Sequence, residues 1–101
     1  MIVVHAAFPI DPDHWDEAMD LVETLVAESN EEPGTIDYRA TTDVVDENTI
    51  RFVERYEDGD AFESHIGTDH FQAFEDRLPD LLAGEPEVMR FEVSDATELE
   101  V

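Results

Sequence analysis

The spacing of hydrophobic and polar positions changes several times along the chain, and each change predicts a new element. Residues 1–8 ("MIVVHAAF") are a short apolar run rich in β-branched side chains, which is typical of a strand. Alternate residues of a strand face opposite sides, and here both sides are largely apolar around His5. We therefore expect a central strand covered on both faces.

A helix is predicted after this strand. Apolar side chains recur at helical spacing over residues 15–26 and form one stripe that should be buried. Asp11 is a good N-cap, and Pro12 suits the first helical position. The Pro-Gly pair at 33–34 should end the helix.

Two alternating segments follow and predict a β-hairpin. Residues 35–44 ("TIDYRATTDV") and 49–57 ("TIRFVERYE") both show the two-residue period of a half-buried strand. Residues 45–48 between them ("VDEN") are typical of a turn.

The second half of the chain predicts two short helices in succession. The first should begin with a cap at Asp58 or Asp60 and end at Gly67. The second should begin with a cap at Thr68 or Asp69, because a phenylalanine-rich stripe with helical spacing follows directly.

Pro79 falls inside this last stripe, where it predicts a kink or an early end of the helix. Residues 85–95 ("EPEVMRFEVSD") predict a final strand. The order is β-α-β-β-α-β, with the second helix in two pieces. Right-handed crossovers then give an α+β, ferredoxin-like fold over residues 1–101, with a four-stranded antiparallel sheet and helices on one face.

The other face of this sheet would also be partly apolar. Val3, Ala7, Val53 and Val88 belong partly to it, and side chains of this kind should not remain in water. Two such sheets packed face to face would cover them. The pattern therefore favours a homodimer with a shared β-barrel core.

Composition adds information about the surroundings. The 101 residues include 28 Asp and Glu against five Arg and no Lys, which gives a net charge of -23. Such a surface repels phosphate backbones and anionic membranes, so we expect neither a nucleic-acid nor a membrane partner. Acid spread this evenly indicates a salt-loving host, where screening reduces self-repulsion. Without cysteine, a long apolar run or a basic leader, the expected location is the cytoplasm.

Three segments carry a resemblance to a known family: "EPGTIDYRA" (32–40), "FVERYED" (52–58) and "AFESHIGTDHFQAF" (61–74). Together they resemble the antibiotic biosynthesis monooxygenase (ABM) domain family, including its small quinol-monooxygenase-like members. The resemblance implies a dimeric α+β barrel with a mostly apolar pocket between the sheet and the helices of each subunit.

The resemblance also implies an activity. Characterised members of the family oxidise phenols or quinols with O2 and use no metal or flavin, because the deprotonated substrate supplies the electrons. We therefore expect a cofactor-independent monooxygenase acting on a quinol or a phenolic, polyketide-like molecule. The alternative is a non-catalytic small-molecule-binding or stress-response dimer of the same fold.

Two histidines are the first catalytic candidates, because imidazole has a pKa near neutrality. His65 ends the first short helix. The alternative to a catalytic role is that it only bonds the free carbonyls at this helix end. His70 lies in the first turn of the next helix, where the dipole favours a neutral ring; alternatively it only orders the turn. We expect no metal site, because Gly67 puts the two rings on different helices and no third ligand is evident.

Glu54 and Tyr56 share a strand face and are the other catalytic candidates. Tyr56 stands where many family members carry tryptophan and would line the pocket, or else act as a core aromatic. Burial of Glu54 would raise its pKa and suit it to proton transfer. The alternative is a salt bridge to Arg39 or Arg51.

The pocket wall itself should be aromatic. His5, Phe52, Phe62, Phe71 and Phe74 are the candidates for lining it, although aromatics at these spacings also suit an ordinary core.

Overall fold

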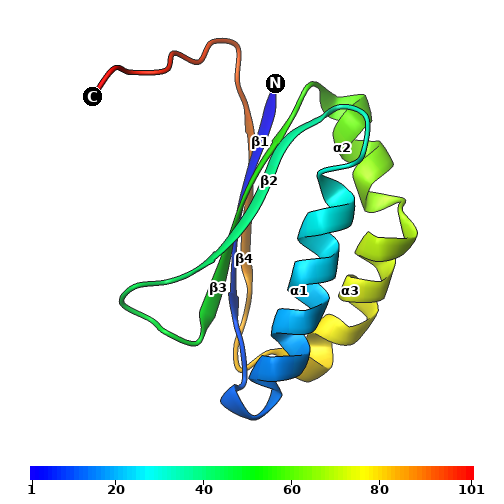
Figure 1. Ribbon diagram of the computed structural model, residues 1–101, viewed down its shortest axis with the longest axis vertical. Helices are drawn as coiled ribbons and strands as arrows, with labels where there is room; N and C mark the ends of the chain where they lie inside the picture. Colours follow the sequence, from blue (N-terminus) through cyan, green and yellow to red (C-terminus); the bar gives the residue numbers. More distant parts are fainter.

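The protein, described over residues 1–101 by a computed structural model, is a four-stranded antiparallel sheet with all its helices on one face (Figure 1). The elements in chain order are β1 (Ile2–Pro9), a 3-10 turn η1 (Pro12–His14), α1 (Trp15–Ser29), β2 (Thr35–Thr42), β3 (Thr49–Tyr56), α2 (Gly59–Ile66), α3 (Asp69–Leu81) and β4 (Glu87–Glu92). The strands lie in the order β2-β3-β1-β4. This confirms the predicted ferredoxin-like fold with a divided second helix.

Strand β1 lies in the middle of the sheet, as its two apolar faces predicted. Ala6 is paired with Phe52 of β3 on one side and with Val88 of β4 on the other. Strands β2 and β3 form the predicted hairpin, with Tyr38 opposite Glu54. Because paired residues point to the same side of a sheet, these five side chains all face the helices.

The hydrophobic core fills the space between that face and the helices. Alternate residues of β1 and β3 point into it, and the buried stripe of α1 packs over them. The largest core side chains include Leu25, Tyr38, Ile50, Phe52 and Tyr56. None of the helices combines the length and the apolarity needed to cross a bilayer.

The helix ends follow local chemistry, with one departure from expectation. Asp11 caps the 3-10 turn η1 rather than α1, because its carboxylate accepts from the N–H of Asp13 and the α-helix begins only at Trp15. Asp58, rather than Asp60, caps α2. Thr68, rather than Asp69, caps α3. Helix α3 continues two residues past the proline at position 79, since the missing N–H removes only one bond near its end.

The sheet face away from the helices is partly apolar. Val53 and Phe91 are about two-fifths exposed there, and Phe91 packs edge-on against the His5 ring at 5.2 Å. Val88 does not belong to this face as predicted, because its pairing with Ala6 turns it toward the helices.

Candidate active site

A cavity of about 340 Å³ lies between the sheet and helices α2 and α3. Its wall is mostly apolar and receives side chains from all four strands. The aromatic lining residues are Phe8, Tyr38, Phe52, Phe62, Phe71 and Phe74. The wall includes one buried carboxyl group, that of Glu54, and one buried imidazole, that of His65, so the chemistry of the cavity depends on how these two groups are held.

His65 lies in the last turn of α2 and its side chain is only 1% exposed. Its ring is packed among the rings of Tyr38, Tyr56 and Phe71 at 5.1–5.4 Å. Nδ1 lies 3.0 Å from an oxygen of Glu32. Nε2 is buried and has no hydrogen-bond partner within the protein. The ring therefore turns inward and does not bond the free carbonyls at the end of its helix.

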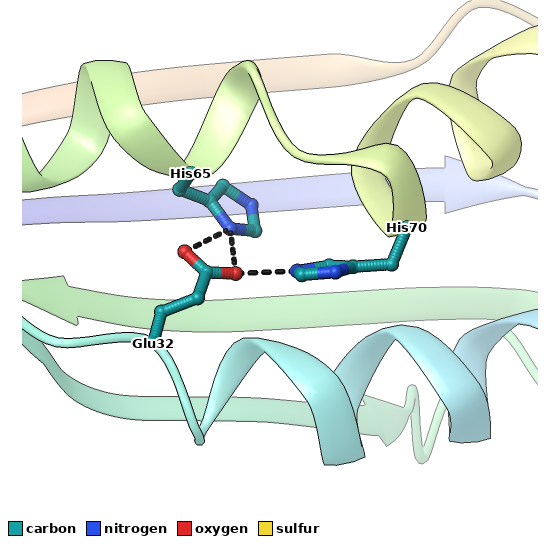
Figure 2. Close-up of side chains that lie close together, drawn as sticks. All are labelled: Glu32, His65 and His70. Carbon is teal, nitrogen blue, oxygen red and sulfur yellow. Dashed lines mark hydrogen bonds and ion pairs between the residues drawn. The ribbon is translucent and has the colours of Figure 1, made fainter.

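Glu32 connects the two histidines of the helix–turn–helix. It lies in the loop between α1 and β2, and its Oε2 is 3.0 Å from Nδ1 of His65 and 2.5 Å from Nε2 of His70 (Figure 2). An ionised carboxylate only accepts hydrogen bonds, so each nitrogen that faces it carries a proton. In the neutral His65 ring, the lone pair is then left on Nε2.

The electrostatic surroundings keep His65 neutral. Burial lowers its pKa below the ordinary value of 6.5, and the hydrogen bond and charge of Glu32 oppose this only in part. His65 lines the cavity. Because a neutral imidazole with Nδ1 already donating can only accept at its other nitrogen, Nε2 is the atom of this residue that can accept a proton.

Glu54 lies on the floor of the cavity with a single side-chain partner. The hydroxyl of Tyr56 donates to Oε1 of Glu54 at 2.5 Å. Burial raises the pKa of Glu54 to about 7, although the Tyr56 hydrogen bond acts in the opposite direction. Burial and the adjacent carboxylate also raise the pKa of Tyr56. The expected salt bridge from Arg39 or Arg51 to Glu54 is not formed, because both arginines point to the opposite face of the sheet. They pair there with Asp37 and Asp43.

The sequence candidates are thus separated by the fold. His5 lies on the opposite face of the sheet, away from the cavity. His70 reaches Glu32 from outside the cavity wall, and Tyr56 supports Glu54 from behind. The sequence did not indicate two residues of this site, Tyr38 and Glu32. Strand alternation could have indicated Tyr38, whereas nothing in the local sequence distinguishes Glu32 from the other acidic residues at the end of α1.

The fold and this site correspond to a known family. A sequence model described as antibiotic biosynthesis monooxygenase matches residues 1–77. The chain belongs to the antibiotic biosynthesis monooxygenase family.

Two curated proteins and one solved structure illustrate the similarity. "Putative monooxygenase YcnE" of Bacillus subtilis is 33% identical over 94% of this chain and 100% of its own length. Protein sll1783 of Synechocystis sp., which is uncharacterised, is 31% identical over 97% of this chain and 67% of its own length. The structure of Rv0793 from Mycobacterium tuberculosis superimposes with a TM-score of 0.89 at 22% identity, over 96% of this chain and 98% of that one. At that identity the last comparison shows the fold alone.

Proposed function

We propose that this protein is a cofactor-independent monooxygenase that oxidises a quinol or a related phenolic molecule with O2. The observation that carries the proposal is His65: a neutral, buried imidazole on the wall of an aromatic cavity, held at Nδ1 by Glu32, with no protein partner at Nε2. A general base needs this arrangement of a fixed tautomer and a free lone pair.

The proposed reaction begins when His65 Nε2 accepts a proton from a substrate hydroxyl. The electron-rich anion then gives electrons to O2, and one oxygen atom bonds to a ring carbon. The O–O bond breaks, the second oxygen leaves as water, and the ring becomes a hydroxyquinone. A quinol and O2 thus give a hydroxyquinone and water, so the substrate is the only reductant required.

The other polar groups of the site support this step. Glu54, with a pKa of about 7, can return a proton to the departing oxygen at neutral pH. The hydroxyl of Tyr56 holds its carboxyl group in place. Aromatic side chains around the cavity suit a flat aromatic substrate and keep water from the anion.

The proposal includes a homodimer that covers the open face of the sheet, and a host with high internal salt, as the charge of -23 suggests. A binding protein without activity is the alternative. It would be favoured if the histidines were fixed by backbone groups alone, whereas His65 and His70 both bond to the side chain of Glu32.

The test is O2 consumption by purified, chelator-treated protein in multimolar KCl with a panel of reduced quinones and hydroxyanthrones. We expect His65→Gln to lower kcat about 10²- to 10⁴-fold, the usual contribution of a general base. His14→Gln is the matched control, because His14 lies in η1 outside the cavity and should leave kcat unchanged.

Two outcomes would contradict the proposal. Wild-type protein that consumes no O2 with any member of the panel would favour the binding protein. Unchanged turnover by a correctly folded His65→Gln variant would exclude His65 as the base.

A further inference from the structure

We propose that Glu32, His65 and His70 form a binding site for a divalent transition-metal ion such as Zn²⁺. One ligand atom from each of the three side chains lies within 4.8 Å of the other two. The ligands come from the α1–β2 loop, the end of α2 and the start of α3, and they converge on one point (Figure 2). The fold thus supplies the third ligand that the spacing of the two histidines alone does not reveal.

The distances suit an ion after a small adjustment. Glu32 Oε2 lies 3.0 Å from Nδ1 of His65 and 2.5 Å from Nε2 of His70. Ligands on a tetrahedral Zn²⁺ ion with bonds of about 2.0–2.1 Å are roughly 3.3 Å apart. Each of the two oxygen-to-nitrogen distances therefore has to lengthen by less than about 1 Å to admit the ion. Each ring binds through the nitrogen that faces Glu32. That nitrogen gives up its proton when the ion binds, and the other nitrogen of the ring carries a proton in the bound state.

A second carboxylate, that of Glu28, lies close to the other nitrogen of His70. Oε2 of Glu28 lies 3.3 Å from Nδ1 of His70, on the side of the ring away from Glu32. Ligating histidines commonly donate their other N–H to a carboxylate, which orients the ring and raises its basicity. His65, by contrast, keeps an unpartnered Nε2 in a side chain that is only 1% exposed.

The donor set selects the kind of ion. Two imidazole nitrogens and one carboxylate oxygen suit Zn²⁺, Co²⁺, Ni²⁺ or Cu²⁺, whereas Mg²⁺ and Ca²⁺ prefer oxygen ligands only. Three protein ligands leave at least one position for water or another small ligand. The excess of acidic over basic residues along the chain adds a general attraction for cations.

Metal binding would have a consequence for the cavity, and this consequence rests on the proposed function. An ion on Nδ1 of His65 moves the proton to Nε2, which then donates and no longer accepts. Metal binding and the general-base role of His65 therefore exclude one another, so the ion would inhibit turnover and a chelator would restore it.

The site is tested with Co²⁺, whose visible absorption reports nitrogen ligation and low coordination number without any substrate. Chelator-treated protein is titrated with Co²⁺ at high KCl, which suppresses loose binding to surface acids. We expect one tight Co²⁺ per chain that is displaced by Zn²⁺ and resists excess Mg²⁺. Glu32→Gln and His70→Gln should each weaken it at least about 100-fold, and Glu28→Gln about 10-fold.

His5→Gln is the matched control, because His5 lies on the opposite sheet face and should leave the titration unchanged. Circular dichroism of each variant shows that it is folded. Wild-type protein that leaves Co²⁺ with the spectrum of the hydrated ion would overturn the proposal, as would equal affinity of wild type, Glu32→Gln and His70→Gln. Because no substrate is used, this result is independent of the O2 assay.

Discussion

At the scale of single residues, the environment of the Glu54 carboxyl group has a consequence for stability. This group is buried and has the Tyr56 hydroxyl as its one side-chain hydrogen-bond donor. Burial of an ionised carboxylate with so little compensation is unfavourable, so its pKa rises from the ordinary 4.5 to about 7. The folded state consequently retains a proton that the unfolded chain releases.

This proton predicts a pH dependence of stability. A carboxyl with a raised folded pKa contributes stability that is fully present below the unfolded value of 4.5 and is lost as pH rises through about 7. Glu54→Gln removes the loss, since the amide stays neutral and still accepts from Tyr56. From about pH 5 to pH 8, the unfolding free energy of wild type should therefore fall by about 2–3 kcal/mol relative to that of the variant.

Urea unfolding at both pH values in high salt measures this difference. Glu47→Gln is the control, because Glu47 is exposed in the β2–β3 loop. The stability of this variant should change with pH in the same way as that of wild type. Parallel behaviour of the Glu54 variant would mean that Glu54 is ionised in the folded protein at neutral pH.

At the scale of elements, the short loop between α1 and β2 positions the Glu32 carboxylate. Asn30 fixes its start, because the side-chain amide donates to the carbonyls of Val26 and Tyr38 and its oxygen accepts from the Tyr38 N–H. Gly34 ends the loop with φ +91°, a left-handed conformation that other residues rarely adopt. The loop can therefore reverse direction beside α2 and bring Glu32 to the buried ring.

Gly34→Ala should destabilise the protein by about 1–3 kcal/mol. A Cβ at this position would lie 2.7 Å from Cβ of Ala61 in α2, and the positive φ adds backbone strain. Chemical denaturation measures the loss. Gly84→Ala is the matched control, because its Cβ would meet only an ordinary contact of 3.5 Å with Pro9. Equal effects of the two substitutions would show that the loop can move to relieve the strain.

At the scale of the whole molecule, the sheet is covered on one side only. Val53, Met89 and Phe91 are substantially exposed on the face opposite the helices. A four-stranded sheet with an apolar open face favours burial against a second copy. This is the physical basis of the proposed homodimer.

Val53→Glu should convert the protein from a dimer of twice 11.5 kDa to a monomer. A carboxylate in the centre of a packed sheet face would lose its water without gaining a partner. Light scattering after size exclusion in high salt measures the mass. Ala73→Glu adds the same charge on the exposed side of α3 and should leave the dimer intact. A wild-type mass of one chain would refute the proposed dimer.

Local sequence determined most of the architecture. The periods of the apolar residues gave the order of strands and helices, and Asp58 and Thr68 were among the expected caps. Such features depend on neighbours within a few residues, so they can be read without the fold. The start of α1 could not be predicted in this way, because a cap such as Asp11 suits a 3-10 turn as well as an α-helix.

Sequence alone determined the strands, the helices, the excess of negative charge and the segments that indicate the family. The tertiary structure decided which groups meet. Glu32 lies 33 and 38 positions from the histidines that it contacts, and β-strand alternation alone could not say on which sheet face His5 would lie. The reason is physical: periodicity separates buried from exposed positions, whereas a site arises where loops and helix ends from distant parts of the chain converge.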